Sequence, residues 1–400
     1  MRWYYHCPAC GADYDIVPGR YLCDRCSALQ KPQQPLAGIL EVEWDGDDGE
    51  YRGEKGPVRA DDFRIPLPVE PRWFPRIPVG NTPLWEPSRL REKLGFKRLF
   101  LKDDTCNPTG SFKDRASILV AAFAAQHGIR EIALASTGNA ASSMAGIGAA
   151  AGIDVTVFLP SSAPQAKRIQ VLQYGAALRQ VEGTYDVAFD LSLEYTSAGK
   201  ALSRNTGYNP LTIEGKKTVS YEIVEQIASA DKASGQAGSA LAHLFVPVGD
   251  GVILSGVYRG FENLLRLERI KTMPTIWACQ ADGSSAVARA LQTGEFGPPV
   301  ASSTIADSIA VDVPRNGAHA LGKLSRYGGR AICVSDREIL DAQRELASTS
   351  GLFAEPSSSA AFAGFLKVRD SLDPASGVVV LITGTGLKDT ASAARGLELF

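Results

Sequence analysis

The stretch Asn107-Pro-Thr-Gly-Ser-Phe-Lys-Asp-Arg115 places one lysine, Lys113, between a loop with proline and glycine and a long alanine-rich run. The run from Lys113 to His127 predicts a helix, which Gly128 ends. The positive potential at a helix N-terminus lowers the pKa of a lysine there. The neutral amine is a nucleophile towards carbonyl groups, such as an aldehyde. The alternative is an ordinary surface lysine in a first helical turn.

Around this stretch, predicted strands and helices alternate. The predicted strands are Arg98–Lys102, Glu131–Ala135, Ile153–Leu159, Ala177–Val181, Ala242–Val248, Thr275–Gln280, Ala331–Val334 and Gly377–Thr383. The further predicted helices are Asn139–Ala151, Pro164–Tyr174, Asp186–Gly199, Ser255–Arg269, Ser284–Thr293, Asp336–Thr349 and Ser357–Arg369. This alternation indicates an α/β fold, with parallel sheets covered by helices on both faces. Such sheets bind ligands at the carboxyl ends of their strands.

Three segments fall outside the alternation. Gly38–Trp44 predicts a strand near the N-terminus. Ile65–Pro78 holds five prolines in fourteen residues, so we expect it to be extended and irregular. Ser229–Ser239 consists mostly of small and polar residues and predicts a loop.

The composition limits the class of protein. The apolar fraction of 44% supports an ordinary core, and 400 residues allow two or three structural units. A formal net charge of −2 gives no reason to expect a nucleic-acid or membrane-surface partner. The chain has no long apolar run that predicts a transmembrane helix, and its N-terminus lacks the apolar core of a signal peptide. We therefore expect a cytoplasmic protein that binds neither nucleic acid nor membrane.

Four of the seven cysteines form two Cys-x-x-Cys pairs, Cys7 with Cys10 and Cys23 with Cys26. Two such pairs can place four thiolates around a tetrahedral zinc ion. A metal would supply the folding energy that so small a module lacks. A redox pair or a disulfide is the alternative. The expected cytoplasmic location favours a zinc-ribbon-like module over residues 1–35.

Two loops that join a strand to a helix suit anions. Ser136-Thr137-Gly-Asn139 offers backbone N–H groups and hydroxyls to a carboxylate, although a simple helix cap is an equally good interpretation. Val246-Pro-Val-Gly-Asp-Gly251 brings two glycines to a helix N-terminus, which suits a phosphate, although turns use such glycines freely. Asp250 is an anion beside an anion site, so its side chain should point away or cap the helix.

Two further segments follow late in the chain. Thr383 would present a hydroxyl at the carboxyl end of the last predicted strand, with a turn threonine as the alternative. Glu355 precedes Pro356 and should be extended, with a helix that starts after it. It either shapes the floor of a pocket or only leads into the helix.

In order and spacing, these segments resemble pyridoxal-phosphate enzymes of the tryptophan-synthase-β fold type (fold type II), and most closely the threonine synthase family. The resemblance covers about residues 75–400, and a cysteine knuckle also precedes the catalytic part of some threonine synthases. It implies that Lys113 binds pyridoxal 5′-phosphate as a Schiff base and moves the Cα proton of the substrate. Asn139 would donate to the 3′-oxygen of the cofactor.

The same resemblance assigns the other segments. The loop of Gly249, Asp250 and Gly251 would hold the cofactor phosphate. Thr383 would face the pyridine nitrogen. The loop that begins at Ser136 and Thr137 would bind the α-carboxylate of the substrate.

Two positions depart from threonine synthases, which must bind the phosphate of O-phosphohomoserine. Ala140 and Thr212 stand where these enzymes commonly have a threonine and an arginine. A threonine hydroxyl cannot form the bidentate, charge-assisted pair that an arginine forms with a phosphate. Either another cation compensates or the substrate differs. The candidate cations are Lys167, Arg168, Lys216 and Lys217, of which the first two are favoured because they lie in a helix of the small domain.

The resemblance implies two doubly wound α/β domains after the zinc-ribbon-like module. Residues 36–115 and 200–400 would form a large cofactor-binding domain, and residues 116–199 a small mobile domain. The predicted activity is that of threonine synthase, a carbon–oxygen lyase. The alternatives are a β-replacement or β-elimination enzyme (cysteate synthase-like on O-phosphoserine, or serine/threonine dehydratase-like) and a non-catalytic binding protein. We expect a homodimer with a small amino-acid substrate.

Overall fold

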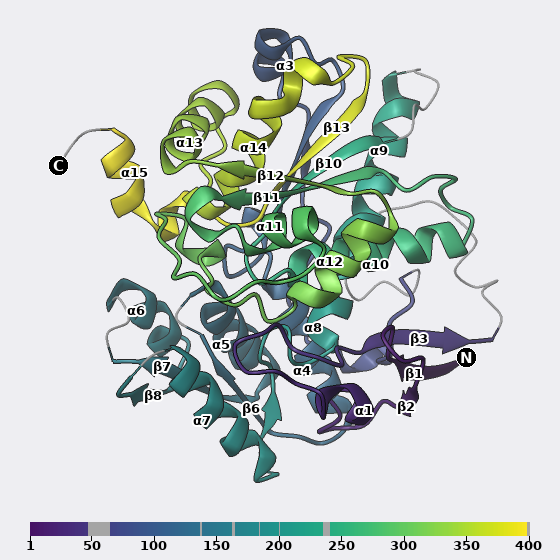
Figure 1. The fold of residues 1–400 in the computed structure, drawn as a ribbon, viewed down its shortest axis with the longest axis vertical. Helices are drawn as coiled ribbons and strands as arrows, with labels where there is room; N and C mark the ends of the chain where they lie inside the picture. The colour runs from purple at the N-terminus through teal and green to yellow at the C-terminus, as the bar shows by residue number, and fades with distance from the viewer. Residues whose placement is uncertain are drawn as a thin grey trace.

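The computed structural model describes residues 1–46, 65–136, 138–161, 165–183, 185–199, 201–234 and 241–397. In this part of the chain the strands form three sheets, of six, four and three strands. Figure 1 shows the six-stranded sheet in the upper half of the molecule and the four-stranded sheet in the lower half. The three-stranded sheet lies beside them near the N-terminus. The predicted α/β fold is confirmed.

The six-stranded sheet has the order β12-β11-β10-β13-β5-β4. Its strands are β4 (Leu84–Trp85), β5 (Leu99–Asp103), β10 (Leu241–Pro247), β11 (Thr275–Ala281), β12 (Arg330–Val334) and β13 (Gly377–Ile382). Neighbouring strands are parallel except β4 and β5. The parallel strands are apolar runs because both faces are buried, and alternate residues of β13 enter two different cores.

Helices cover both faces of this sheet. The first face carries α9 (Thr218–Ser234), α10 (Val252–Arg266), α11 (Ala286–Thr293) and α12 (Gly317–Arg326). The second face carries α3 (Ser88–Leu94), α13 (Asp336–Ser350) and α14 (Pro356–Val368). Elsewhere lie α8 (Leu211–Glu214), α15 (Thr390–Gly396) and the 3₁₀ turns η1 (Pro71–Trp73), η2 (Asp104–Cys106), η3 (Gly215–Lys217), η4 (Asp282–Ser284), η5 (Asp307–Ile309), η6 (Arg369–Ser371) and η7 (Gly386–Lys388).

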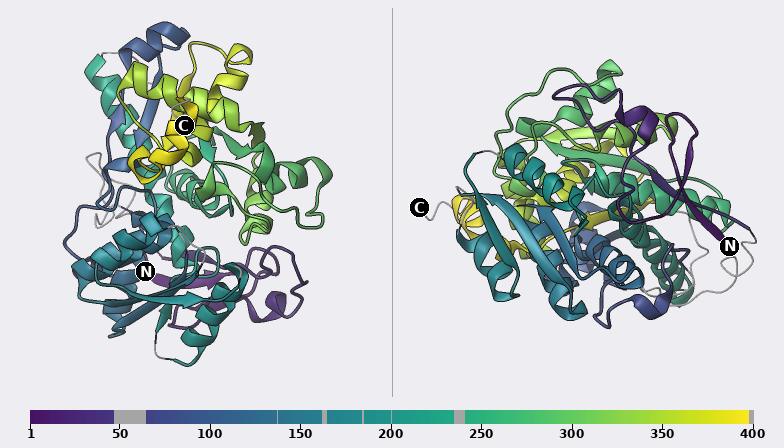
Figure 2. Two further views of the ribbon diagram at one scale, coloured as in Figure 1. Left: turned by 90° about the vertical axis from the view of Figure 1, so that its left-hand side faces the viewer. Right: turned by 90° about the horizontal axis from the view of Figure 1, so that it is seen from below.

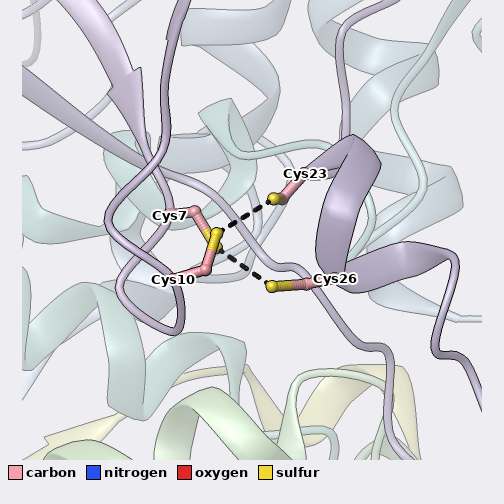
Figure 3. Close-up of side chains that lie close together, drawn as sticks. All are labelled: Cys7, Cys10, Cys23 and Cys26. Atoms are coloured by element: carbon pink, nitrogen blue, oxygen red, sulfur yellow. Dashed lines mark hydrogen bonds between the residues drawn. The ribbon is translucent and has the colours of Figure 1, made fainter.

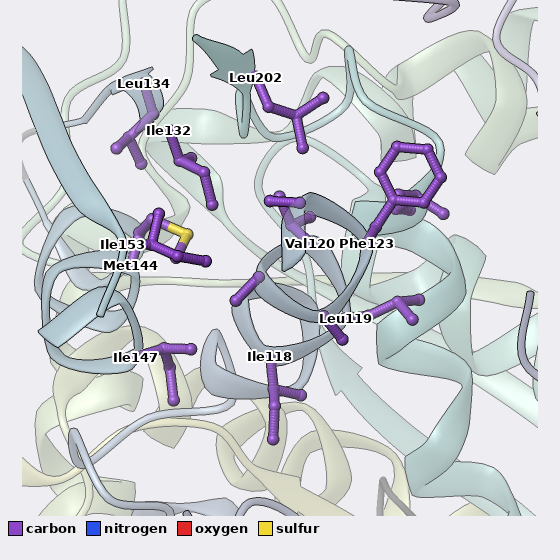
Figure 4. Packing of buried hydrophobic residues seen from close by; sticks show 14 of the residues in the cluster. Ile118, Leu119, Val120, Phe123, Ile132, Leu134, Met144, Ile147, Ile153 and Leu202 are labelled. Atoms are coloured by element: carbon purple, nitrogen blue, oxygen red, sulfur yellow. The ribbon is translucent and has the colours of Figure 1, made fainter. Parts of the chain in front are cut away.

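The four-stranded sheet is parallel, with the order β8-β7-β6-β9. Its strands are β6 (Glu131–Ala135), β7 (Asp154–Pro160), β8 (Ala177–Val181) and β9 (Leu202–Ser203). The helices that accompany it are α4 (Asp114–Gln126), α5 (Asn139–Ala151), α6 (Gln165–Gln173) and α7 (Tyr185–Ser197). Figure 4 shows the core of this half, where side chains such as Leu119, Ile132 and Met144 from α4, β6 and α5 pack together.

The N-terminal module is an antiparallel sheet of the order β2-β1-β3 with one short helix. Its elements are β1 (Arg2–His6), β2 (Asp13–Asp15), α1 (Asp24–Ser27) and β3 (Glu41–Asp45). Figure 2 shows it beside the rest of the molecule in two further views. Buried charges anchor it: Arg259 of α10 donates to the Glu43 carboxylate at 2.7 Å. On α12, His319 Nε2 lies 2.6 Å from Glu41 Oε1, while its Nδ1 lies 2.8 Å from the Ser255 hydroxyl of α10.

One predicted loop is partly wrong. Helix α9 continues to Ser234, so the first half of the predicted loop Ser229–Ser239 is helical, and the remainder lies outside the described residues. Its alanines and charged residues favour a helix by propensity, although few are apolar enough to reveal a helical period. The predicted domain boundaries at residues 35, 115 and 199 stay a prediction.

Candidate active site

The loop that carries Lys113 is held against the carboxyl end of β13 by backbone hydrogen bonds. The Phe112 N–H donates to the Thr383 carbonyl oxygen at 2.8 Å, and the Thr385 N–H donates to the Gly110 carbonyl oxygen at 3.2 Å. An isolated β-bridge joins the same two segments. The loop therefore places Lys113, at the N-cap position of α4, close to the end of a strand that is distant in the sequence.

A buried ion network fixes the start of α4. Arg115 Nε donates to Asp104 Oδ2 at 2.5 Å, and its Nη1 donates to Glu222 Oε1 at 2.6 Å. Glu222 also accepts from Lys102 Nζ at 2.6 Å. All four side chains are shielded from solvent, and two carboxylates balance two cations. Such charge-assisted hydrogen bonds hold the lysine loop firmly on the large sheet.

The surroundings of Lys113 favour its neutral form. Burial is the main cause that lowers its pKa below the usual lysine value. The carboxylates of Asp250 and Glu355 oppose this effect, whereas Arg204 adds to it. The pKa is lowered, as expected from the sequence, and its main cause is burial.

The Ser136–Asn139 loop opens α5, as predicted. The Ser136 hydroxyl oxygen accepts from the N–H groups of Gly138 and Ala141, each at 3.2 Å, so it caps the helix. Asn139 is largely buried, and its Nδ2 donates to the two oxygens of the Glu355 carboxylate at 2.9 and 3.1 Å. Thr137 lies outside the described residues.

The glycine loop joins β10 to α10. Gly251 has a φ of +89°, which disfavours any residue with a side chain. A Cβ on Gly249 would lie 2.8 Å from the Ile309 Cα. Asp250 Oδ1 accepts from the Val252 N–H at 3.0 Å. Of the two expectations for Asp250, this contact with the first residue of α10 fits the second, a side chain turned to the helix start, and the loop brings its N–H groups to the same place.

Thr383 and Glu355 meet at the end of β13. The Thr383 N–H donates to the Ser358 hydroxyl at 2.8 Å. The Glu355 N–H donates to the Gly384 carbonyl oxygen at 2.9 Å. A Cβ on Gly384 would lie 2.4 Å from Glu355 Oε1, so a side chain at this position would displace the carboxylate. Glu355 therefore connects the end of β13 to Asn139, the first residue of α5, which packs on the four-stranded sheet.

A cavity of about 180 Å³ lies between the two halves of the molecule. Its lining residues are Gly138, Asn139, Ser142, Gln170, Asp307, Ser308, Glu355, Pro356, Ser357, Leu387, Lys388 and Asp389. Asn139 thus lines the cavity directly, whereas Lys113, Thr383 and the glycine loop do not. Lys113 is linked to it through its electrostatic interaction with Glu355.

The four candidate cations differ in their surroundings. Lys167 lies in α6, but its side chain is outside the described part, and Arg168 on the same helix is half-buried. Lys217 is fully buried and pairs with Glu214. Lys216 is also fully buried.

The four module cysteines come together, as predicted. Figure 3 shows their side chains pointing toward one another. All four sulfur atoms lie within 4.8 Å of one another, with Cys7 and Cys26 3.8 Å apart and Cys10 and Cys23 3.5 Å apart. A tetrahedral zinc site with Zn–S bonds of about 2.3 Å has S···S edges of about 3.8 Å. The cluster matches this spacing.

Sequence reasoning missed two residues near Lys113. Arg204 follows the two-residue strand β9 and is fully buried, but it belongs to no motif that marks it. Lys388 Nζ donates to the Ser142 hydroxyl of α5 at 3.1 Å and so joins the two halves across the cavity. The segment Thr383-Gly-Thr-Gly-Leu-Lys388 is the part of the sequence that could have marked Lys388 as a residue near the site.

Comparisons with known proteins agree with this site. Residues 76–384 match the model of the pyridoxal-phosphate dependent enzyme family. The chain is 33% identical over 395 residues to a threonine synthase from Methanosarcina acetivorans, with 96% of this chain and 92% of the relative covered. It is 31% identical over 408 residues to a threonine synthase from Methanocaldococcus jannaschii, with 98% and 94% covered.

A solved structure shares the fold. An L-serine ammonia-lyase from the fungus Rhizomucor miehei superposes with a TM-score of 0.68 and 23% identity, over 79% of this chain and 97% of that chain. Among the described helices, none combines the length and apolarity that a lipid bilayer would require. The match over residues 76–384 includes the lysine loop, the glycine loop and Thr383. The chain belongs to the family of pyridoxal-phosphate-dependent enzymes.

Proposed function

We propose that this protein is a pyridoxal-phosphate-dependent lyase of the threonine synthase type, which converts O-phosphohomoserine and water to threonine and phosphate. The observation that carries the proposal is the backbone connection between the Lys113 loop and Thr383. It brings a lysine of lowered pKa to the carboxyl end of a parallel sheet, where such folds bind ligands. The similarity of nearly the whole chain to two archaeal threonine synthases supports the choice of reaction.

The residues present fit the cofactor. Lys113 offers a half-buried amine of lowered pKa, and the loop of Gly249 and Gly251 offers a helix N-terminus for a phosphate. The Ser111 hydroxyl is buried and has no hydrogen-bond partner within the described part of the chain, so the lysine loop holds a donor for a bound group. When bound, pyridoxal phosphate supplies an electron sink for charge that develops at the substrate Cα.

The protein's own residues would hold the cofactor and move protons. Lys113 would hold the cofactor through its amine. Once the substrate's amino group has taken its place there, the freed amine would accept the Cα proton of the substrate. Asn139 would donate to the 3′-oxygen, and its contact with Glu355 would orient its amide. The N–H groups of the Gly249–Gly251 loop would bind the phosphate, and the Thr383 hydroxyl would face the pyridine nitrogen.

The substrate would lie against α5 and α6. Ser136 and Thr137 are proposed to bind its α-carboxylate at the N-terminus of α5. Lys167 and Arg168 are proposed to contact its phosphate, since α6 reaches the cavity through Gln170. Closure of the small half over the substrate would then exclude water from the reacting atoms.

Replacing Arg168 with Ala should lower kcat/KM for O-phosphohomoserine by about 10- to 150-fold, because one charge-assisted contact of about 1.5–3 kcal/mol is lost. Phosphate release measured at several substrate concentrations would give this ratio. Arg130→Ala is the control, since this exposed arginine lies at the start of β6, away from the cavity. Equal kcat/KM values for wild type and Arg168→Ala would contradict the assignment.

The departures at Thr212 and Ala140 favour one second candidate, elimination or replacement at Cβ of O-phosphoserine or serine. The test is a screen of O-phosphohomoserine, O-phosphoserine, serine and threonine, with phosphate, ammonia and keto-acid release followed together. Threonine and phosphate from O-phosphohomoserine would establish the proposed reaction. Pyruvate and ammonia from serine, without phosphate release from O-phosphohomoserine, would replace it. A protein that converts none of the four would be the non-catalytic relative.

We propose that Cys7, Cys10, Cys23 and Cys26 bind one structural zinc ion, because four protein ligands leave no open position. Cys23→Ser should abolish stoichiometric zinc and lower the free energy of unfolding, while the cofactor spectrum of the folded fraction stays unchanged. Metal analysis of protein purified under reducing conditions would check this. Cys333→Ser, which changes a thiol outside the cluster, should keep the metal. Wild-type protein without stoichiometric metal would disprove the site.

We further propose a cytoplasmic homodimer with a small mobile domain over residues 116–199, as the resemblance to the family implies. Sedimentation velocity of the holoenzyme would detect the dimer, and a monomer at micromolar concentration would contradict it. Fractionation of the source cells would test the location. Limited proteolysis with and without substrate should show protection of the small domain, and identical patterns would argue against its closure.

A further inference from the structure

Lys216 differs from two other fully buried lysines in the group that its Nζ contacts. Lys102 and Lys217 each form an ion pair with a buried carboxylate. The Lys216 Nζ instead donates to the carbonyl oxygen of Thr212, at 2.9 Å. Within the described part of the chain, no carboxylate lies within ion-pair distance of this ammonium. Charging a lysine that is buried without a counter-ion is costly, so a bound anion that supplies the counter-charge would favour its ammonium form.

Packing places Lys216 between the two helices that start at the candidate site. A Cβ on Gly215 would lie 2.2 Å from the Arg115 carbonyl oxygen, near the start of α4. Gly256 lies in the second turn of α10, and a Cβ on it would lie 2.5 Å from the Lys216 Cβ. The turn η3 is therefore in direct contact with both helices, close to Lys113 on one side and to the glycine loop on the other.

The charges around Lys216 belong to the candidate active site. Its pKa lies well below the usual lysine value, first because of burial and then because of the positive charges of Lys113 and Arg204. Asp250 of the glycine loop opposes this effect. Two lysines and an arginine thus act on one another, and the carboxylates of Asp250 and, beside Lys113, Glu355 offset only part of their charge. An anion bound among them would relieve the repulsion.

We infer that Lys216 binds the phosphate group of a phosphate monoester. The inference rests on the proposed function, in which both the cofactor and the substrate are phosphate monoesters. A phosphate dianion suits this place because its charge and three terminal oxygens can engage several cationic donors at once. Lys216 then supplies, one helical turn after Thr212, the charge that the arginine of threonine synthases would bring.

The test uses the holoenzyme and two matched variants, Lys216→Met and Lys217→Met. Lys216→Met removes a buried charge that has no carboxylate partner, so the Tm should stay unchanged or rise. Lys217→Met leaves the Glu214 carboxylate buried without its partner, so the Tm should fall, but phosphate affinity should remain as in the wild type. Lys216→Gln takes the place of Lys216→Met if that variant does not fold.

Three measurements separate the two sources of phosphate. They are the calorimetric affinity of the holoenzyme for inorganic phosphate, kcat/KM for O-phosphohomoserine, and the rate of cofactor loss on dialysis, followed by its visible absorbance. If Lys216 binds the substrate phosphate, Lys216→Met lowers the phosphate affinity and kcat/KM by about 10- to 150-fold. The rate of cofactor loss then stays unchanged. If it binds the cofactor phosphate, the cofactor is lost faster by a comparable factor. Either result supports the inference.

Two results would overturn it. Wild-type phosphate affinity and cofactor retention in Lys216→Met would show that Lys216 is a packing residue only. Alternatively, phosphate affinity could fall equally in both variants, which would indicate a general loss of structure. A wild-type holoenzyme that releases no phosphate from O-phosphohomoserine would contradict the proposed function only. The calorimetry and dialysis would still decide the role of Lys216.

Discussion

Replacement of Lys113 with Ala should lower turnover by about 10⁴-fold or more, the upper end of what a positioned acid–base group contributes. The loss is large because one amine both binds the cofactor aldehyde and carries the substrate proton. The side chain sits at the N-cap of α4, where its backbone is held by the Phe112–Thr383 hydrogen bond. Circular dichroism should therefore show an unchanged fold, and a small primary amine added to the variant should restore part of the activity.

Chemical labelling would confirm which lysine binds the cofactor. Borohydride reduction of the wild-type holoenzyme, followed by peptide mapping, should attach the cofactor to Lys113. Lys102 is buried in an ion pair with Glu222, and Lys388 donates to Ser142, so neither should carry the label. Label on either of them would refute the assignment of Lys113.

Replacement of Arg115 with Met should lower the free energy of unfolding by about 3–5 kcal/mol, because two carboxylates remain buried without their main partner. Arg115 is fully buried and contacts both Asp104 and Glu222. Urea unfolding of wild type and variant at pH 7 would measure the loss. The matched control is Arg337→Met, which breaks an exposed pair with Asp341 and should cost less than about 1 kcal/mol. Equal costs for the two variants would contradict the role of the network.

The same network predicts a dependence of stability on pH. Burial raises the pKa of Glu222, but Arg115 and Lys102 outweigh it and hold this pKa at about 2. A carboxylate whose pKa is lower in the folded state stabilises the fold at pH values above its unfolded pKa. This contribution is lost as the pH falls from about 5 towards 2. In Arg115→Met the pKa of Glu222 should rise, so this part of the acid-induced loss should shrink.

The regular part of the fold could be predicted from the sequence because its signals are local. Short strand-like segments with glycines nearby located β6 and β8 to the residue, and α5, which Gly152 ends, was located likewise. Helix α9 (Thr218–Ser234) was not among the predicted helices, and its last turns, whose small and polar residues carry little apolar period, were predicted as a loop. The two-residue strand β9 has no local signal, since only pairing with β6 makes it a strand.

The candidate site was predictable only in part, for a related reason. Glycines and hydroxyls at the ends of strands mark a ligand site, since parallel strands gather these ends at one edge. The contact of Asn139 with Glu355 joins residues from different halves of the chain, and no spacing rule encodes it. The counter-ion of a buried lysine is equally hidden: Lys216 and Lys217 are neighbours in the sequence, yet one has a carboxylate partner and the other does not.

The anchoring of the N-terminal module has a consequence for biosynthesis. Glu41 meets His319, which lies 278 residues later in the chain. At usual translation rates, that interval takes tens of seconds, during which the nascent module lacks this contact and its proposed zinc ion helps to hold it together. The module thus emerges from the ribosome long before α10 and α12, against which it packs, have been synthesised. Zinc supply during growth should therefore change the yield of folded enzyme more than the turnover of molecules that have matured.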